Sequence, residues 1–296
     1  MNISDKFKQK KVVFSLEVFP PKKTSPIETI YSTFSDIWQV PSDFISVTYG
    51  AGGSDVQKNK TCKIASLLKS EYSVEPLAHL TCLNSDKEEI RLTLDSLKQN
   101  GISNVLALRG DKNPEVEPKN VFTNASDLVS FIKEYDSSFN VVGACYPEGH
   151  GECESLQKDV ENLKNKIDAG VSHLITQLFF DNDQFFAFMD RLEKNGIDVP
   201  VEAGIMPIIN KAQIERTVTM CGASLPRKFS HMISRYASDP LALRDAGIAY
   251  ATQQIIELVS SGVQGIHLYT MNNIDLAIKI NENIRSVIRS ANKEND

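Results

Sequence analysis

The sequence alternates between short apolar runs and longer amphipathic segments, and this alternation constrains the fold more than any other feature. Runs rich in β-branched and aromatic residues predict eight strands, at residues 12–19, 44–49, 77–82, 104–109, 140–146, 173–180, 199–205 and 265–270. Helical periodicity follows at residues 26–40, 58–70, 86–100, 125–135, 154–169, 183–195, 211–221, 240–260 and 274–289, with shorter pieces between 221 and 240. Eight strands that alternate with helices predict an α/β fold, the (β/α)8 TIM barrel.

A doubly wound parallel sheet is the alternative arrangement of these segments. No GxGxxG motif follows the first strand, and the count of eight favours the barrel. A length of 296 residues suits one barrel. We therefore expect residues 1–296 to form a single catalytic domain without a regulatory domain.

Charge and cysteine content exclude several classes of protein. The net charge is −6 with no basic run, which argues against a nucleic-acid partner and, more weakly, against an anionic membrane surface. No apolar run has the length of a membrane span or a signal peptide, so we expect a cytoplasmic protein. The five cysteines include no CxxC pair, and Cys145, Cys153 and His150 are too widely spaced for a typical zinc site. We expect no metal.

One carboxylate stands inside the first predicted strand, just before Pro20 and Pro21. Side chains alternate between the two faces of a strand, so Val13, Ser15, Glu17 and Phe19 share one face, opposite Val12, Phe14, Leu16 and Val18. A carboxylate among apolar neighbours must be exposed, paired or functional. Glu17 is therefore the first candidate for a catalytic residue.

Polar side chains gather at the C-terminal ends of the predicted strands, where the active sites of barrels lie. After Glu17 these strand ends contribute Thr48, His79, Thr81, Arg109, Gly110, Asp111, Tyr146, Glu148, His150, Gln177, Tyr269 and Asn272. A solvated rim is one interpretation, but this mixture also suits a polar, aromatic and partly anionic ligand. The opposite strand ends offer little. The long loop at 112–124 is a candidate lid.

A second polar set lies on the predicted helix at 154–169. Asp159, Asn162 and Lys166 recur at helical spacing beside the apolar stripe. Such a stripe is normally a solvated face, and the alternative is a ligand that lies along the helix.

Six motifs in order resemble one family. They are LEVFPP around Glu17, VTYG at 47–50, AHLTC around His79, ALRGD at 107–111, YPE at 146–148 and ITQLFF at 175–180. Over residues 12–284 the chain resembles the catalytic barrel of methylenetetrahydrofolate reductase, of the single-domain bacterial type. Each motif is weak alone, and their common order makes the resemblance specific.

This resemblance implies a non-covalent FAD and the reduction of 5,10-methylenetetrahydrofolate to 5-methyltetrahydrofolate. NADH, or less favoured NADPH, is the implied co-substrate in a ping-pong reaction that provides methyl groups for methionine synthesis, and a homo-oligomer is implied. The implied flavin contacts are Thr48, His79, Arg109, Gly110, Asp111, Ala125, Tyr146, His150, Asp159, Asn162 and Lys166. The implied folate-handling residues are Glu17, Asp111, Gln177 and Gln213.

The implied catalytic roles fit the chemistry of Glu17, Asp111 and Gln177. Opening the five-membered ring of the folate requires a proton on the leaving nitrogen, and Glu17 is the implied general acid. An ionised Asp111 would stabilise the cationic iminium that results. Gln177 both donates and accepts, which suits the amide edge of the pterin. Arg109 and Lys166 suit the pyrophosphate and ribose of FAD.

The chain departs from the family pattern at three positions. Asn273 and Asn165 stand where Arg is common, and Val171 stands where Ala is usual. The Asn273 change predicts a weaker or differently held glutamyl tail, and the Val171 change predicts weaker flavin retention. Two other functions remain open from the residues alone: a cofactor-free barrel lyase or transferase acting on an anionic metabolite, and a folate-binding partner subunit without turnover.

Overall fold

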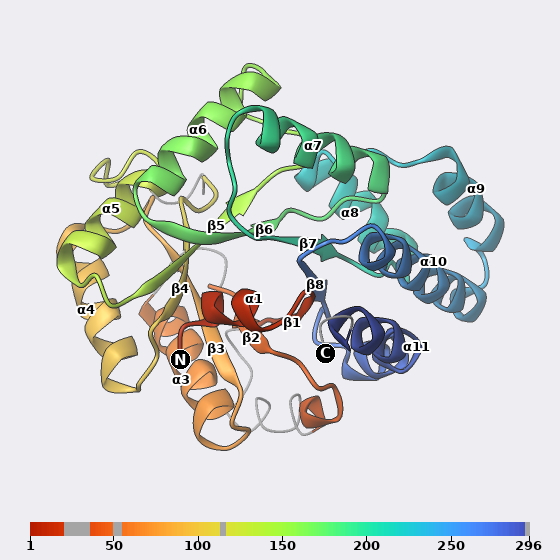
Figure 1. Cartoon of the computed structure of the whole chain (residues 1–296), viewed down its shortest axis with the longest axis horizontal. Coiled ribbons are helices and arrows are strands. Elements are labelled where there is room, and N and C mark those ends of the chain that lie inside the picture. The colour runs from red at the N-terminus through yellow and green to blue at the C-terminus, as the bar shows by residue number, and fades with distance from the viewer. Residues whose placement is uncertain (21–35, 50–54, 113–116, 294–296) are drawn as a thin grey trace.

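The eight strands form one closed parallel barrel in chain order, as Figure 1 shows in the computed structural model of the protein. The structure describes residues 1–20, 36–49, 55–112 and 117–293. The strands are β1 (Val13–Val18), β2 (Phe44–Val47), β3 (Glu75–Thr81), β4 (Asn104–Leu108), β5 (Asn140–Cys145), β6 (Val171–Thr176), β7 (Val201–Ile205) and β8 (Gly265–Tyr269). The predicted (β/α)8 fold is confirmed.

Helices surround the barrel and connect its strands (Figure 1). They are α1 (Lys6–Gln9), α3 (Asp55–Ser70), α4 (Lys87–Gln99), α5 (Ala125–Tyr135), α6 (Leu156–Asp168), α7 (Asn182–Lys194), α8 (Lys211–Cys221), α9 (Arg227–Tyr236), α10 (Pro240–Ser260) and α11 (Ile274–Lys293). The bounds predicted for α5, α8 and α10 are confirmed to the residue. None of the helices that the structure describes has the length and apolar character needed to cross a membrane.

Some predictions fall where the structure gives no description. Most of the helix predicted at 26–40 lies outside the described residues. The described part of this range contains the short 3-10 helix η2 (Ile37–Gln39). The glycine-rich segment at 50–53 and residues 113–116 of the candidate lid also lie outside them.

The sixth strand differs from its prediction at both ends. It begins at Val171, and residues 177–180, predicted as strand, lie beyond its end. Leu178, Phe179 and Phe180 are nevertheless buried, because their side chains pack into the hydrophobic cores beside the barrel. Burial without strand pairing produces the same apolar run in a sequence, and this explains the error.

The first strand has the predicted two faces. Phe14, Leu16 and Val18 pack into the main core between the barrel and its helices, whereas Val13 packs inside the barrel. Glu17 is on the same inner face, at the C-terminal end of β1. The two-residue period of the strand therefore delivers the carboxylate to the mouth of the barrel.

The N-terminal segment closes the other end of the barrel. Ile3 is fully buried against the inner apolar layer, and its N–H donates to Asn104 Oδ1 over 3.0 Å. The ring of Phe7 lies 4.9 Å from the ring of His173, and α1 crosses the centre of the barrel in Figure 1. This plug leaves the C-terminal ends of the strands as the open face.

Candidate active site

Two adjoining cavities occupy the C-terminal face of the barrel. The mouth cavity, lined by Glu17, His79, Asp111, Gln177 and their neighbours, has a volume of about 690 Å³. The α6 cavity, lined by Ala125, Asp159, Lys166 and their neighbours, has a volume of about 350 Å³. Both cavities are lined by Leu108, Arg109, Ala144, Tyr146 and His150. An elongated ligand can therefore lie across both.

All but one of the predicted site residues line these two cavities. The mouth cavity takes Glu17, Thr48, His79, Arg109, Gly110, Asp111, Tyr146, His150 and Gln177. The α6 cavity takes Arg109, Ala125, Tyr146, His150, Asp159, Asn162 and Lys166. Residues far apart in the sequence are thus assembled into one site by the barrel. Their individual roles remain predictions.

Gln213 lies outside the lining of both cavities. Its side-chain oxygen accepts from the Ile209 N–H over 3.1 Å, and its side-chain nitrogen donates to the Pro207 carbonyl over 3.2 Å. The amide thus ties the start of α8 to the loop that follows β7. The folate contact predicted for Gln213 stays a prediction.

Glu17 lies on the floor of the mouth cavity and is 6% exposed. His79 Nε2 lies 3.5 Å and His267 Nε2 3.6 Å from Glu17 Oε2, and Ser46 Oγ donates to the same oxygen over 3.4 Å. Burial lowers the pKa of His79 to about 4, so this imidazole is neutral at physiological pH. Glu17 is therefore buried beside two imidazoles and a hydroxyl group.

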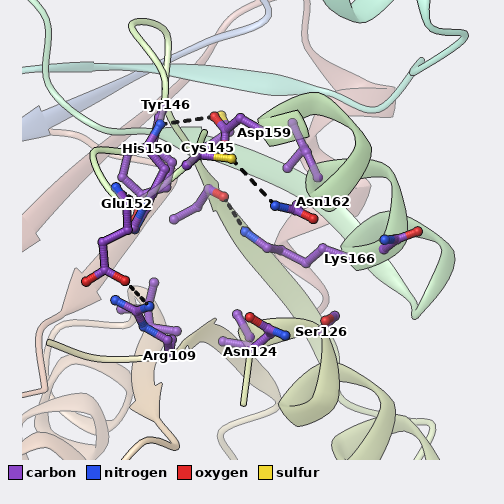
Figure 2. Close-up of a pocket in the computed structure, with 17 residues that line it drawn as sticks. Arg109, Asn124, Ser126, Cys145, Tyr146, His150, Glu152, Asp159, Asn162 and Lys166 are labelled. Carbon is purple, nitrogen blue, oxygen red and sulfur yellow. Dashed lines mark hydrogen bonds and ion pairs between the residues drawn. The ribbon is translucent and has the colours of Figure 1, made fainter. Parts of the chain in front are cut away.

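The inner face of α6 lines the α6 cavity with polar side chains. Ser155 caps the helix by accepting from the Lys158 N–H over 3.2 Å. Lys166 reaches inward and donates to the Ala144 carbonyl over 2.7 Å (Figure 2). Burial lowers the pKa of Lys166 and raises the pKa of Asp159. The desolvated cation and carboxylate favour the ligand-binding interpretation of this stripe over a solvated face.

Two glycines make room for the cavity lining. A Cβ at Gly143 would lie 3.1 Å from Lys166 Cδ and 3.2 Å from Val171 Cγ1. Val171, the departure from the family pattern, and the stem of Lys166 therefore both border the space that Gly143 leaves. Gly110 has a φ of +90°, and a Cβ there would lie 3.1 Å from Thr81 Cβ.

Arg109 is paired across the cavity with a residue that the sequence analysis missed. Its Nη1 donates to Glu152 Oε2 over 2.7 Å (Figure 2). The guanidinium lowers the pKa of Glu152 to about 2. Glu152 lies 43 positions from Arg109 in a loop, where no periodicity or motif marks it. The ring of Tyr146 packs edge-on against His150 nearby, with centroids 4.7 Å apart.

The interior of the barrel also holds polar side chains below the strand ends. Ser15, His173, Glu202 and His267 are fully buried inside the barrel. They are scattered over β1, β6, β7 and β8, so only their convergence in three dimensions distinguishes them. Within the described residues, no group of three His, Cys, Asp or Glu side chains is placed to hold a metal ion.

Fold and site together define a barrel of the catalytic type, with a buried acid at its mouth and a long polar cavity beside it. The methylenetetrahydrofolate reductase family profile matches residues 2–285. The chain belongs to the methylenetetrahydrofolate reductase family.

Individual relatives agree with this assignment. The chain is 35% identical to 5,10-methylenetetrahydrofolate reductase of Pectobacterium carotovorum over 272 residues, which cover 92% of this chain and 90% of the relative. It is 34% identical to methylenetetrahydrofolate reductase (NADH) 1 of Arabidopsis thaliana, covering 96% of this chain and 51% of that longer protein. A solved Clostridium thermocellum protein that binds two copies of 5-methyl-5,6,7,8-tetrahydrofolic acid shares the fold, with a TM-score of 0.70, 13% identity and coverage of 96% and 99%.

Proposed function

We propose that this protein reduces 5,10-methylenetetrahydrofolate to 5-methyltetrahydrofolate with NAD(P)H, NADH being favoured, through a bound FAD. The observation that carries the proposal is the position of Glu17, a buried carboxyl group on the floor of a cavity large enough for a pterin. Family membership and the names of the relatives support the same reaction.

The residues around the α6 cavity fit a flavin dinucleotide. Arg109 and Lys166 are cations of the kind that bind phosphate and ribose oxygens. Asp159 and Asn162 offer acceptors and a donor for hydroxyl groups, and Gly110 lets the backbone approach closely. His79 Nε2 has no hydrogen-bond partner among the described residues, and the His79 side chain lines the mouth cavity, where a ring of the cofactor would contact it.

Bound FAD would supply the redox chemistry, taking a hydride from the nicotinamide and passing it to the folate methylene carbon in a separate half-reaction. The protein then has two tasks, to bind both partners in turn and to activate the folate. Glu17 would hold a proton on its carboxyl group and give it to the leaving nitrogen of the five-membered ring. The proton converts the ring into an open iminium that accepts the hydride.

Asp111 and Gln177 would position and stabilise that folate. Asp111 lies exposed on the rim of the mouth cavity, where its carboxylate can face the positive charge of the iminium. The Gln177 side-chain oxygen accepts from the Leu178 N–H over 2.9 Å, which leaves its amide hydrogens directed to the pterin edge. Asn273 accepts from the Leu276 N–H over 3.1 Å at the start of α11, so it serves as a helix cap.

The cellular setting follows from the same proposal. The product would carry methyl groups to methionine synthesis, in the cytoplasm, with methylenetetrahydrofolate and NAD(P)H as small-molecule partners and no nucleic acid or membrane. The amphipathic outer helices would allow a homo-oligomer. Size measurement by light scattering tests the last point independently of activity.

Purified protein tests the central proposal directly. Bound flavin gives a yellow solution that absorbs at about 450 nm, and NADH added without oxygen should bleach it. Methylenetetrahydrofolate added next should restore the colour and yield 5-methyltetrahydrofolate, identified by mass. A colourless protein that FAD fails to reconstitute would favour a cofactor-free barrel enzyme. Flavin that bleaches with NADH but never passes its electrons to the folate would contradict the proposed substrate.

A further inference from the structure

A chain of buried polar side chains runs through the barrel interior from Glu17. Ser46 Oγ lies 3.4 Å from both Glu17 Oε2 and His267 Nε2. His267 Nδ1 lies 2.6 Å from Ser15 Oγ, and Ser15 Oγ lies 2.6 Å from Glu202 Oε2. Each link is within hydrogen-bond distance, so the carboxyl groups of Glu17 and Glu202 are connected through hydroxyl and imidazole groups.

The far end of this chain is sealed from water. Ser15, Glu202 and His267 are each 0% exposed. The barrel makes room for the Glu202 side chain with Gly265, since a Cβ there would lie 2.6 Å from Glu202 Cγ. Phe7 of the N-terminal plug closes the space below, with its ring 4.9 Å from His173. Glu17 is the member of this hydrogen-bonded chain that lines the mouth cavity.

Glu202 and Glu17 are faced mainly by hydroxyl, imidazole and phenol side chains. Ser15, His173 and His267 face Glu202, and Asp43 raises its pKa more weakly. Ser46, His79, His267 and Tyr269 face Glu17. Burial lowers the pKa of His173 to about 3, so that imidazole carries no charge. Burial raises the pKa of Glu202 to about 8, and the carboxyl therefore keeps its proton at neutral pH.

A protonated Glu202 sets the direction of every hydrogen bond in the chain. Ser15 Oγ donates to Glu202 Oε2 when the carboxyl group is ionised; a Glu202 that holds its proton on this oxygen donates to Ser15 Oγ instead, and Ser15 can then donate to His267 Nδ1. His267 must then carry its hydrogen on Nε2, the atom that faces Glu17 and Ser46. The chain is thus arranged to deliver a proton at the Glu17 carboxylate.

We propose that Glu202 is a buried proton reserve that reloads Glu17 through Ser15 and His267 while folate covers the mouth of the barrel. This inference rests on the proposed function, because it gives Glu17 a source for the proton that the folate reaction consumes. Glu202 acts only through its neighbours and is a positioning residue in this scheme.

The transfer balances without any further reactant. As Glu17 gives up its proton, His267 Nε2 releases its hydrogen to the developing Glu17 carboxylate, directly or through the Ser46 hydroxyl, so the folate step itself depends on the chain. His267 Nδ1 takes the Ser15 hydroxyl proton, and Ser15 takes the proton of Glu202. Glu17 ends protonated and Glu202 ionised, with His267 and Ser15 neutral as before. When the folate leaves, the Glu17 proton passes back to Glu202 by the same steps in reverse, and solvent then protonates the Glu17 carboxylate.

Anaerobic stopped-flow measurements on the flavin-loaded protein separate the two half-reactions. We expect the folate step of the native protein to slow as Glu202 ionises near pH 8. Glu202→Gln can still donate to Ser15 but has no proton to release. We expect its folate step at pH 7 to be about tenfold slower and to lack the change near pH 8, with flavin reduction by NADH unaltered. Native rates and a native pH profile in this variant would overturn the proposal.

Two further variants separate proton transfer from loss of packing. Ser15→Ala removes the hydroxyl that joins Glu202 to His267, and it should slow the folate step as Glu202→Gln does. Asn140 is also buried, and its side chain hydrogen-bonds to Ser4 and Asn104, away from Glu17. Asn140→Ala should therefore lower stability without changing the pH profile. A matching change of the profile in Asn140→Ala would assign the effect to packing and overturn the proposal.

Infrared spectroscopy of the flavin-free protein detects the reserve without any turnover. We expect a carbonyl band of a buried, protonated carboxyl group at pH 7 that shifts in heavy water, disappears near pH 8 and is absent from Glu202→Gln. Absence of this band from the native protein at pH 7 overturns the proton reserve on its own. A native protein whose reduced flavin fails to react with the folate overturns the proposed function instead, so the two failures are distinguishable.

Discussion

Arg109 Nη1 donates to Glu152 Oε2 over 2.7 Å across the boundary between the two cavities. In the flavin-free protein the carboxylate of Glu152 thus neutralises a guanidinium that is a predicted flavin contact. Phosphate oxygens of FAD and the carboxylate of Glu152 compete for the same donors. The ion pair is therefore expected to weaken the retention of FAD.

Glu152→Gln should consequently bind FAD more tightly, by roughly two- to fivefold at low salt, because an exposed ion pair contributes little but its carboxylate repels phosphate. The gain should shrink as ionic strength rises. Quenching of FAD fluorescence on titration with flavin-free protein measures the affinity. Glu161→Gln, which removes an exposed carboxylate from α6 where it pairs with Lys158, is the matched control. An equal gain in Glu161→Gln would show that only net charge matters.

Glu17→Gln should keep flavin reduction by NADH and lose folate reduction by about 10²- to 10⁴-fold, the usual contribution of a general acid. The amide preserves the size of the side chain and the bond from Ser46, so folate binding should change little. Stopped-flow traces of each half-reaction provide the measurement, and NADH reduction is the internal control. Normal folate turnover in Glu17→Gln would contradict the role of this residue as proton donor.

The pH dependence of stability should reveal Glu202. Its pKa is raised from 4.5 to about 8 on folding, so its contribution is complete below pH 4.5 and is lost as the pH rises towards 8. His79 and His173 have lowered pKa values, and their contributions change only below pH 6.5. Between pH 6.5 and 8 the native protein should lose about 2 kcal/mol of unfolding free energy relative to Glu202→Gln. Urea unfolding measures this difference, and parallel curves for the two proteins would show that Glu202 does not hold its proton.

Gly265→Ala should destabilise the barrel by about 1 to 3 kcal/mol, because the new methyl group would lie 2.6 Å from Glu202 Cγ and 3.3 Å from the Phe7 ring. Gly151→Ala is the matched control, since nothing lies within 4 Å of a Cβ at that position. Denaturant midpoints of the two variants provide the comparison. A Gly265→Ala protein as stable as Gly151→Ala would show that Glu202 can move aside freely.

The architecture was predictable from the sequence because it depends on local patterns. Two-residue and 3.6-residue periodicities identify strands and helices, and eight alternating units have few ways to close. The same periodicity placed Glu17 on the inner face of β1, and the strand-end rule named many of the residues that line the mouth cavity, including Arg109 and Gln177. The predicted end of β6 was wrong because Leu178 and Phe180 are buried by side-chain packing and not by strand pairing.

Contacts between distant residues were decided only by the tertiary structure. Glu152 reaches Arg109 from a loop, and Glu202 meets Ser15 across 187 positions of sequence. No periodic pattern in the sequence marks Glu152 or Glu202. Each forms its hydrogen bond with a residue that only the closed barrel places beside it. The position of Glu17 was determined by the sequence of one strand, whereas its hydrogen-bonded neighbours come from several other strands. Polar groups inside a barrel are identified by their convergence, and convergence is a property of the closed fold.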